Sequence, residues 1–297
     1  MNLNLSTDTL KRSSAYASIG VSVVLIALKG IVYFETGSLS VQVSLLDSIL
    51  DAIASFINVY AIHKSLQPPT HEYRFGFGKA EALAGLGQSA LIFASALWLG
   101  VKAITHITSP MGHDIDHQSL YLMVMASGLT ILLIMWQRYV MKRTESLAVA
   151  ADNLHYETDL YLNVGTFFAL YLTHKTGYTW IDVLFALSAV ALIAYRTIPI
   201  AQKSFDVLMD RELDLATRQK IIDITLANPD VKGIHELRTR SSGNFEVIQF
   251  HIVLDNNMTL HHAHSIAHAV EDAVIAEFPN AHVIIHQDPY QDEVDTH

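Results

Sequence analysis

The sequence predicts a membrane bundle of six transmembrane α-helices, followed by a small cytoplasmic α+β domain at the C-terminus. Two observations predict this fold class. Hydrophobic residues make up 51% of the 297 positions and charged residues only 16%, a composition unusual for a soluble protein. Apolar segments also crowd the first 210 residues, whereas residues 211–297 have the mixed composition of a soluble domain. We therefore expect two domains, 1–210 and 211–297, with a disordered extreme C-terminus.

Six apolar segments are each long enough to cross a hydrocarbon core about 30 Å thick. They cover residues 13–34, 39–66, 80–106, 119–139, 147–173 and 180–204. The second and the fifth are the least apolar, because each carries a pair of ionisable residues. A protein with these segments has the lipid bilayer as a partner.

Basic residues predict the orientation of these segments. They lie near the termini and in alternate connections, as Lys11, Arg12, Lys64, Arg74, Lys79, Arg138, Lys142, Arg143, Lys203 and Arg211. The remaining connections, 35–38, 109–118 and 174–178, contain one lysine between them. By the positive-inside rule, both termini are predicted to be cytoplasmic.

The C-terminal part shows the element order α-β-β-α-β. A helix is expected over 213–228, strands over 231–240 and 245–254, a second helix over 260–278 and a third strand over 281–286. This order is typical of a two-layer domain with helices on one face of a small sheet. With fewer than about ninety residues the domain has a limited core, so oligomerisation or a bound metal would help to stabilise it.

Composition also limits the partners. The formal charge of −10 argues against nucleic acid and is compatible with a cation as substrate. Cysteine is absent, so neither disulfides nor thiolate metal sites are available. Any metal must therefore be held by oxygen ligands and by the imidazoles of the sixteen histidines.

Two pairs of ligand-type residues interrupt the apolar segments. Asp47 and Asp51 lie in the second segment, and His155 and Asp159 lie in the fifth. Residues four apart share one face of a helix. An isolated charge inside a bilayer costs several kcal/mol, which favours four ligands facing an ion over four ligands facing lipid. The alternative is that the pairs hydrogen-bond neighbouring helices or line a watery crevice.

Four oxygen and nitrogen ligands match tetrahedral Zn²⁺, although Cd²⁺, Fe²⁺ or Mn²⁺ would also fit. Because metal ligands must be deprotonated, metal entry should expel protons, and His155 is the expected exchanger. Asp152 and Asn163 lie close to the same helix face and are candidates for supporting hydrogen bonds.

Three functions use such a site. The first is a proton-coupled antiporter that exports the metal by alternating access, and the second is a passive metal channel or sensor. The third, an intramembrane hydrolase, is disfavoured because the sequence lacks a His-Glu-x-x-His motif and a fully liganded metal leaves no position for water. We therefore expect a transporter and not an enzyme.

Histidines also gather in the C-terminal part. His286 and Asp288 are two residues apart and point to one side if the strand continues that far. His251 alternates with the apolar residues of its strand and so faces away from them. On the second helix, His261, His264 and His268 share a face, and spacing alone does not choose among them. The alternative is a polar sheet surface with unrelated histidines.

Several stretches together carry a resemblance to a known family. They are Leu46-Asp47-Ser48-Ile49-Leu50-Asp51, Gly78-Lys79-Ala80-Glu81, Leu154-His155-Tyr156-Glu157-Thr158-Asp159, His235-Glu236-Leu237-Arg238-Thr239-Arg240, and Val283-Ile284-Ile285-His286-Gln287-Asp288-Pro289. On these motifs the chain resembles the cation diffusion facilitator family, in its bacterial ferrous-iron and zinc efflux branch. The resemblance extends over nearly the whole chain.

The resemblance implies a homodimeric metal/proton antiporter of the bacterial inner membrane, with no organic cofactor. It implies a transport site of Asp47, Asp51, His155 and Asp159. It also implies a ferredoxin-like regulatory and dimerisation domain, in which a two-metal cluster is formed by His235, His251, His264, His286 and Asp288. Zn²⁺ would be both substrate and structural or regulatory ion. A charge pair of Lys79 and Asp210 would lock the membrane and soluble parts together.

One stretch departs from the family pattern. Relatives often bind another metal between the second and third spans, through an acidic residue and two histidines. Here Thr70 stands in place of the acid, and Tyr73 and Phe77 stand in place of the histidines. Because neither ring substitutes for imidazole, we predict that this loop site is absent. His71 and Glu72 could form a weaker replacement, but a solvated loop is the favoured interpretation.

Overall fold

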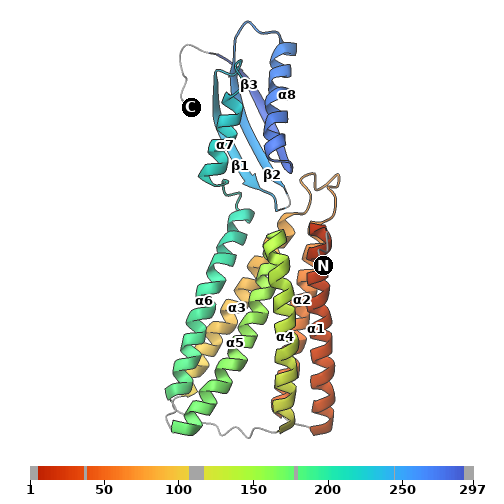
Figure 1. The fold of residues 1–297 in the computed structure, drawn as a ribbon, viewed down its shortest axis with the longest axis vertical. Helices are drawn as coiled ribbons and strands as arrows, with labels where there is room; N and C mark the ends of the chain where they lie inside the picture. Colours follow the sequence, from red (N-terminus) through yellow and green to blue (C-terminus); the bar gives the residue numbers. More distant parts are fainter. Residues whose placement is uncertain (1–5, 37–38, 107–116, 177–179, 244, 291–297) are drawn as a thin grey trace. The chain divides into compact units, whose positions relative to one another are not determined.

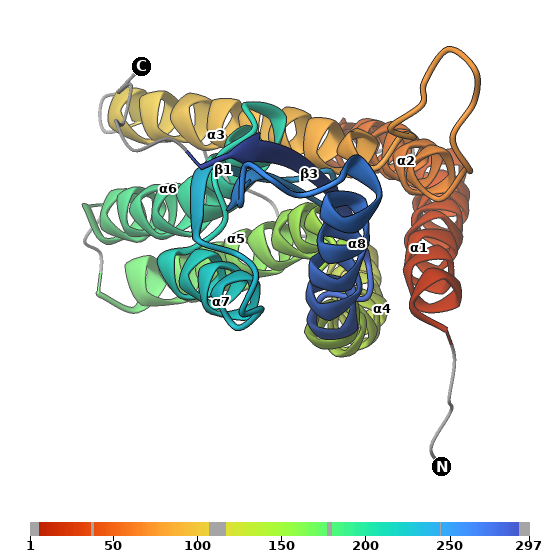
Figure 2. The ribbon, with the colours of Figure 1, turned by 90° about the horizontal axis from the view of Figure 1, so that it is seen from above.

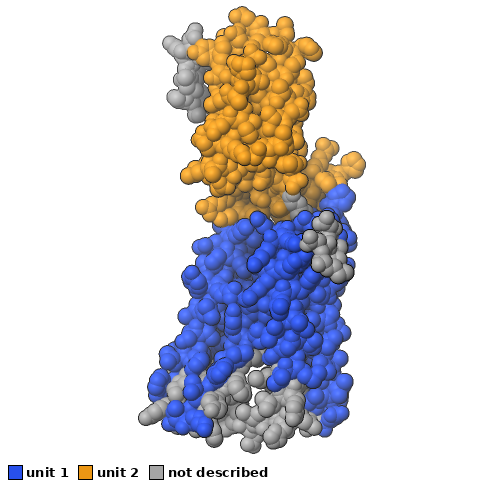
Figure 3. Space-filling view, viewed as in Figure 1, with its two compact units in different colours: residues 1–68, 80–205 blue, residues 69–79, 206–297 orange. Residues whose placement is uncertain are grey.

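The computed structural model describes residues 6–36, 39–106, 117–176, 180–243 and 245–290. The chain divides into two compact units (Figure 3). The first comprises Met1–Pro68 and Ala80–Phe205, and the second comprises Pro69–Lys79 and Asp206–His297. The loop that joins the second and third helices thus belongs to the second unit. The predicted disordered C-terminus lies outside the described residues.

Long helices make up the first unit (Figure 1). They are α1 (Thr7–Thr36), α2 (Leu39–Ser65), α3 (Lys79–His106), α4 (His117–Thr144), α5 (Leu147–Thr176) and α6 (Trp180–Leu208). Within the described residues, five of them contain a stretch long and apolar enough to span a membrane, and α5 is not one of these. The prediction of six spans is therefore supported for five helices. Helix α5 is 30 residues long, and its described part carries the ionisable residues Asp152, His155, Glu157 and Asp159.

Each of these helices buries some apolar side chains against its neighbours and exposes others on the outside of the unit. Buried residues of α1, α2, α4 and α5 pack in one cluster: Leu10, Ala15, Ile62, Val140, Ala148 and Val149. A second cluster joins α3, α5 and α6 through Ile92, Ala96, Leu154 and Ile193. Helices α3 and α6 are neighbours in the view of Figure 2. They approach closely at Gly85, where an added Cβ would lie 2.8 Å from the hydroxyl oxygen of Ser204. Exposed Leu83, Trp98 and Leu132 illustrate the outer apolar surface, which suits contact with lipid.

The second unit has the predicted order of elements. It contains α7 (Leu215–Leu226), β1 (Gly233–Ser241), β2 (Glu246–Leu254), α8 (Leu260–Glu277) and β3 (Ala281–Pro289). Strand β2 is central, antiparallel to β1 and parallel to β3. One face of the sheet is buried through Ile248, Phe250 and Ile252, which pack in one core with Val270 and Val274 of α8. Alternate residues of β2, including His251, therefore lie on the opposite face.

Charged and aromatic contacts hold the loop Pro69–Lys79 within this unit. The Lys79 ammonium lies 2.7 Å from Asp210, whose other oxygen lies 3.2 Å from Arg240. The Arg240 guanidinium also lies over the ring of Phe75, 5.2 Å from its centroid. Gly243 has φ +87°, and a Cβ there would lie 2.4 Å from the carbonyl oxygen of Gly78. The predicted Lys79 and Asp210 pair is thus formed, and its proposed locking role remains a prediction.

Asp210 provides a test of this pairing by pH. Partial burial raises the pKa of Asp210, but the hydrogen bond and charge of Lys79, together with Arg240, outweigh it and lower the pKa below the ordinary 3.8. A carboxylate with a lowered folded pKa contributes stability above its unfolded pKa, and that contribution is lost as pH falls through the folded pKa. We expect wild type to lose more thermal stability than Asp210→Asn between about pH 5 and pH 3. Equal losses would contradict the pairing, and Asp230→Asn is the exposed control.

In the same loop, the rings of Tyr73 and Phe77 lie 4.8 Å apart, centroid to centroid. Their contact is one between aromatic rings and offers no imidazole nitrogen. His71 and Glu72 are both exposed. The absence of a loop metal site remains a prediction.

Candidate metal centres

The first candidate centre joins α2 and α5. Ligand atoms of Asp51, His155 and Asp159 all lie within 4.8 Å of one another. The Nε2 atom of His155 is 2.9 Å from Oδ1 of Asp51 and 3.7 Å from Oδ2 of Asp159. All three side chains are mostly buried, with 18–33% of their surface exposed. The helical spacing in α5 therefore brings His155 and Asp159 together as predicted, and helix packing adds Asp51.

Asp47, the fourth predicted ligand, lies apart from this group. Among the described residues, the group whose ligand atoms lie within 4.8 Å of one another does not include Asp47. The residue is exposed. It nevertheless lies one helical turn before Asp51 on α2, where Cβ atoms are about 5–6 Å apart. Its part in the ligand set remains a prediction.

Asp152 makes its hydrogen bonds with other helices. It is 1% exposed, and its carboxylate accepts from Ser18 at 2.5 Å, Gln137 at 2.6 Å and Gln88 at 3.2 Å. These bonds tie α5 to α1, α4 and α3. The supporting role of Asp152 beside His155 remains a prediction. The side chain of Asn163 lies outside the described residues.

Sequence reasoning missed a second buried acid on α5. Glu157 is 2% exposed and lies between two arginines, 2.8 Å from Arg138 on α4 and 2.7 Å from Arg196 on α6. The two charges come from helices far apart in the sequence. No local pattern marks Arg196 as a partner of α5, although a lone arginine in an apolar segment could have been noticed.

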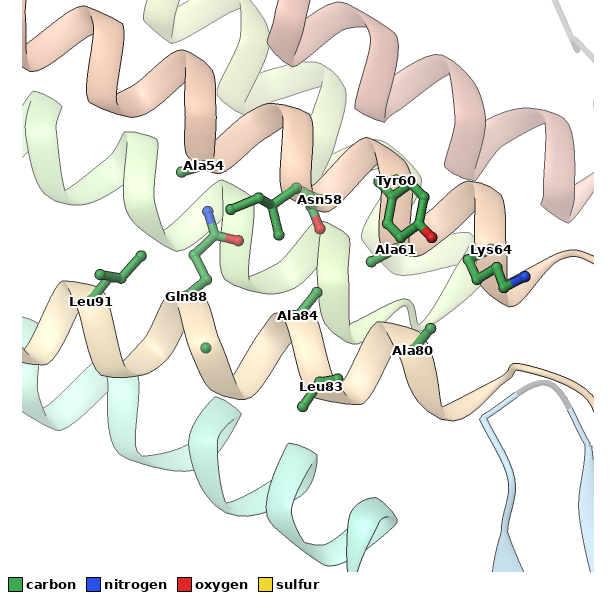
Figure 4. A pocket seen from close by; sticks show the side chains of 12 residues that line it. Ala54, Asn58, Tyr60, Ala61, Lys64, Ala80, Leu83, Ala84, Gln88 and Leu91 are labelled. Atoms are coloured by element: carbon green, nitrogen blue, oxygen red, sulfur yellow. The ribbon is translucent and has the colours of Figure 1, made fainter. Parts of the chain in front are cut away.

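A groove between α2 and α3 is a separate feature of the first unit. It has a volume of about 290 Å³ and is lined mainly by apolar and small residues such as Ala54, Ala84, Gly87 and Leu91 (Figure 4). None of the three clustered ligands lines it. Its apolar lining is unsuited to a cation, so the groove is not the metal centre.

The second candidate centre lies on the open face of the small sheet. His251 on β2 is paired with His235 on β1 and with His286 on β3, so the three imidazoles form a row across the strands. Ring centroids are 5.0 Å apart for the first pair and 4.5 Å for the second. Strand β3 continues to Pro289, beyond its predicted end, and places Asp288 beside the row.

The Asp288 carboxylate contacts all three imidazoles. It lies 2.8 Å from Nδ1 of His251, 3.1 Å from Nε2 of His235 and 3.1 Å from Nε2 of His286. Partial burial raises the pKa of Asp288, but the hydrogen bond with His251 and the three imidazoles outweigh this effect and lower it below 3.8. The carboxylate is therefore available as an anionic ligand at neutral pH, beside nitrogen atoms that suit Zn²⁺ or related ions.

His264, predicted as a fifth member, lies elsewhere. It is exposed on α8, where its ring lies 4.8 Å from that of His268. Helix α8 covers the face of the sheet that carries Ile248 and Phe250, which is opposite to the histidine row. In the described part of one chain, four of the five predicted residues come together and His264 does not.

Two family models match this chain, one in the region of the long helices and one in the C-terminal region. The family model for the cation efflux transmembrane domain matches residues 15–209, and the model for the cation efflux protein cytoplasmic domain matches residues 213–290. A cation-efflux pump FieF of Serratia proteamaculans is 40% identical over 280 residues, which cover 94% of this chain and 93% of that protein. The FieF of Shewanella oneidensis is 40% identical over 289 residues, which cover 97% of both chains.

The comparison with solved structures finds variants of the MamM CTD. One is 25% identical over 26% of this chain and 96% of its own, with a TM-score of 0.25.

Proposed function

The chain belongs to the cation efflux family, also called the cation diffusion facilitators, and we propose that it exports Zn²⁺ or a related divalent metal in exchange for protons. Membership makes it a multi-pass membrane protein of a transporter family. The single observation that carries the proposal is the convergence of Asp51, His155 and Asp159 from two helices. A divalent cation is the partner that two buried carboxylates and an imidazole need.

Transport requires that this site open to each side of the membrane in turn. In the proposal, α5 also crosses the bilayer, as the fifth of six spans, and Asp47 completes a four-ligand site by turning toward Asp51. The ligands bind metal only when deprotonated, so protons that enter from outside release the ion. His155 is the proposed carrier of one of them. The proposed location is a bacterial inner membrane with both termini in the cytoplasm, and the distribution of basic residues supports this orientation.

The histidine row is proposed to bind metal and to act in a homodimer. His235, His251, His286 and Asp288 supply four ligands on an open sheet face. His264 is exposed on the far side of the same unit, where it is accessible to a second copy. In the proposed dimer, His264 of the partner subunit completes the cluster, and metal bound there stabilises the dimer.

The transport proposal is tested with purified protein in sealed vesicles. Zn²⁺ uptake should saturate, and it should accelerate when an imposed proton gradient opposes the metal flux. Saturable uptake that ignores the gradient would favour a passive channel. Metal binding without any flux would favour a sensor.

Metal counting tests the histidine row separately. We expect His286→Ala to bind at least one equivalent of Zn²⁺ less than wild type, and to keep the transport activity that depends on Asp51. The loss follows because His286 contacts Asp288 and His251 within the cluster. The exposed His63→Ala is the matched control. An unchanged count in His286→Ala would remove the cytoplasmic site from the proposal.

A further inference from the structure

One lysine side chain of the first unit reaches from α1 to the part of α2 that carries Asp47 and Asp51. Lys29 on α1 extends to α2, where its Nζ lies 2.6 Å from the hydroxyl oxygen of Ser48 and 3.0 Å from the carbonyl oxygen of Ser44. Ser48 is 1% exposed, so this contact lies within the helix packing. Both acceptors are neutral, and the ammonium charge is therefore not cancelled by either.

The position of Ser48 places this charge beside the predicted ligands. Ser48 follows Asp47 directly, and it lies three residues before Asp51, on the same side of α2. The carboxylates of Asp47, Asp51 and Asp159 all lie within electrostatic range of the Lys29 ammonium. Lys29 is thus a basic neighbour of these acids, and it comes from a helix, α1, that carries none of the predicted ligands.

Two other basic residues beside α5 form ion pairs with a different acid, Glu157. Arg138 and Arg196 both lie on Glu157, at 2.8 Å and 2.7 Å. Lys29, in contrast, is held by a hydroxyl and a carbonyl on α2. It therefore stays close to the carboxylates without occupying the oxygen atoms that would bind a metal.

We propose that Lys29 is the fixed counter-charge of the transport site, which matches the site to an ion of charge two and keeps its affinity low enough for release. The inference rests on the proposed function. Three carboxylates with a neutral imidazole carry three negative charges, of which the ammonium balances one. A divalent ion balances the remaining two, so the loaded site is neutral. Neutrality is the state that costs least to enclose in a low-dielectric membrane interior.

The test compares Lys29→Met, Lys29→Gln and Lys29→Arg in full-length protein in vesicles. Without the ammonium, we expect the KM for Zn²⁺ and the maximal uptake rate each to fall at least about tenfold, because the ion is bound more tightly and released more slowly. Inhibition of Zn²⁺ uptake by the trivalent ion La³⁺ should strengthen at least about tenfold relative to wild type. Lys29→Arg should stay within about threefold of wild type, because it keeps the charge.

Lys142→Met, on the exposed cytoplasmic end of α4, is the matched control for loss of a lysine charge. Two results would overturn the inference. An unchanged KM and La³⁺ sensitivity in both neutral variants would show that the charge does not act on the site, and a raised KM would show that Lys29 only anchors α1 to α2. If wild type carries Zn²⁺ but these variants match it, the inference fails and the proposed function stands. If wild type carries no Zn²⁺, both fail.

Discussion

Replacing Asp51 or Asp159 by alanine is expected to abolish Zn²⁺ uptake, with a loss of at least about 100-fold in rate. Each substitution removes one of the three ligands that converge from α2 and α5. Loss of a residue that only hydrogen-bonds a metal ligand already lowers metal affinity or activity about 10–100-fold, so loss of a ligand itself should cost at least as much. The measurement is initial uptake into vesicles under an opposing proton gradient. Asp8→Ala, at the exposed start of α1, is the matched control.

A wild-type rate in either variant would remove the α2 and α5 centre from the mechanism. Asp47→Ala gives further information, because the structure leaves Asp47 outside the cluster of described ligands. A loss as large as that of Asp51→Ala would place Asp47 in the working ligand set. A rate close to wild type would restrict the set to three residues.

Replacing Glu81 by leucine is expected to destabilise the membrane unit by about 3–5 kcal/mol, the usual cost of removing one partner from a buried ion pair. The Glu81 carboxylate lies 2.8 Å from the Lys11 ammonium, and both side chains are less than 10% exposed. It also accepts hydrogen bonds from Ser65, at 3.0 Å, and from Ser146. One carboxylate thus joins α1, α2, α3 and the start of α5.

The measurement is the unfolding of full-length protein in mild detergent. The double variant Lys11→Met with Glu81→Leu should recover most of the loss, because it removes both buried charges. Glu277→Ala breaks the exposed pair with Lys220 and should cost no more than about 1 kcal/mol. A Glu81→Leu variant as stable as that control would contradict the account of the buried pair.

Several features of the fold follow from local sequence patterns. Hydropathy over about twenty residues identified the apolar spans, and the alternation along β2 predicted that His251 faces away from the domain core. Spacing of four residues predicted the contact of His155 with Asp159, which the structure confirms at 3.7 Å. The order α-β-β-α-β is also confirmed. Helix α5 carries several ionisable residues, and over the described residues it is not among the helices that meet the length and hydropathy of a membrane span.

The membrane class, the order of elements and the residues able to bind metal can be predicted from the amino-acid sequence, because these features depend on neighbours within a few turns of chain. Which of those residues meet depends on the packing of distant segments. Packing of α2 against α5 joins Asp51 to His155, and the two faces of one small sheet separate His264 from His251. Packing also places Lys29 of α1 against Ser48 of α2. Such contacts depend on how helices pack and on which face of a sheet is covered, and no local periodicity encodes either.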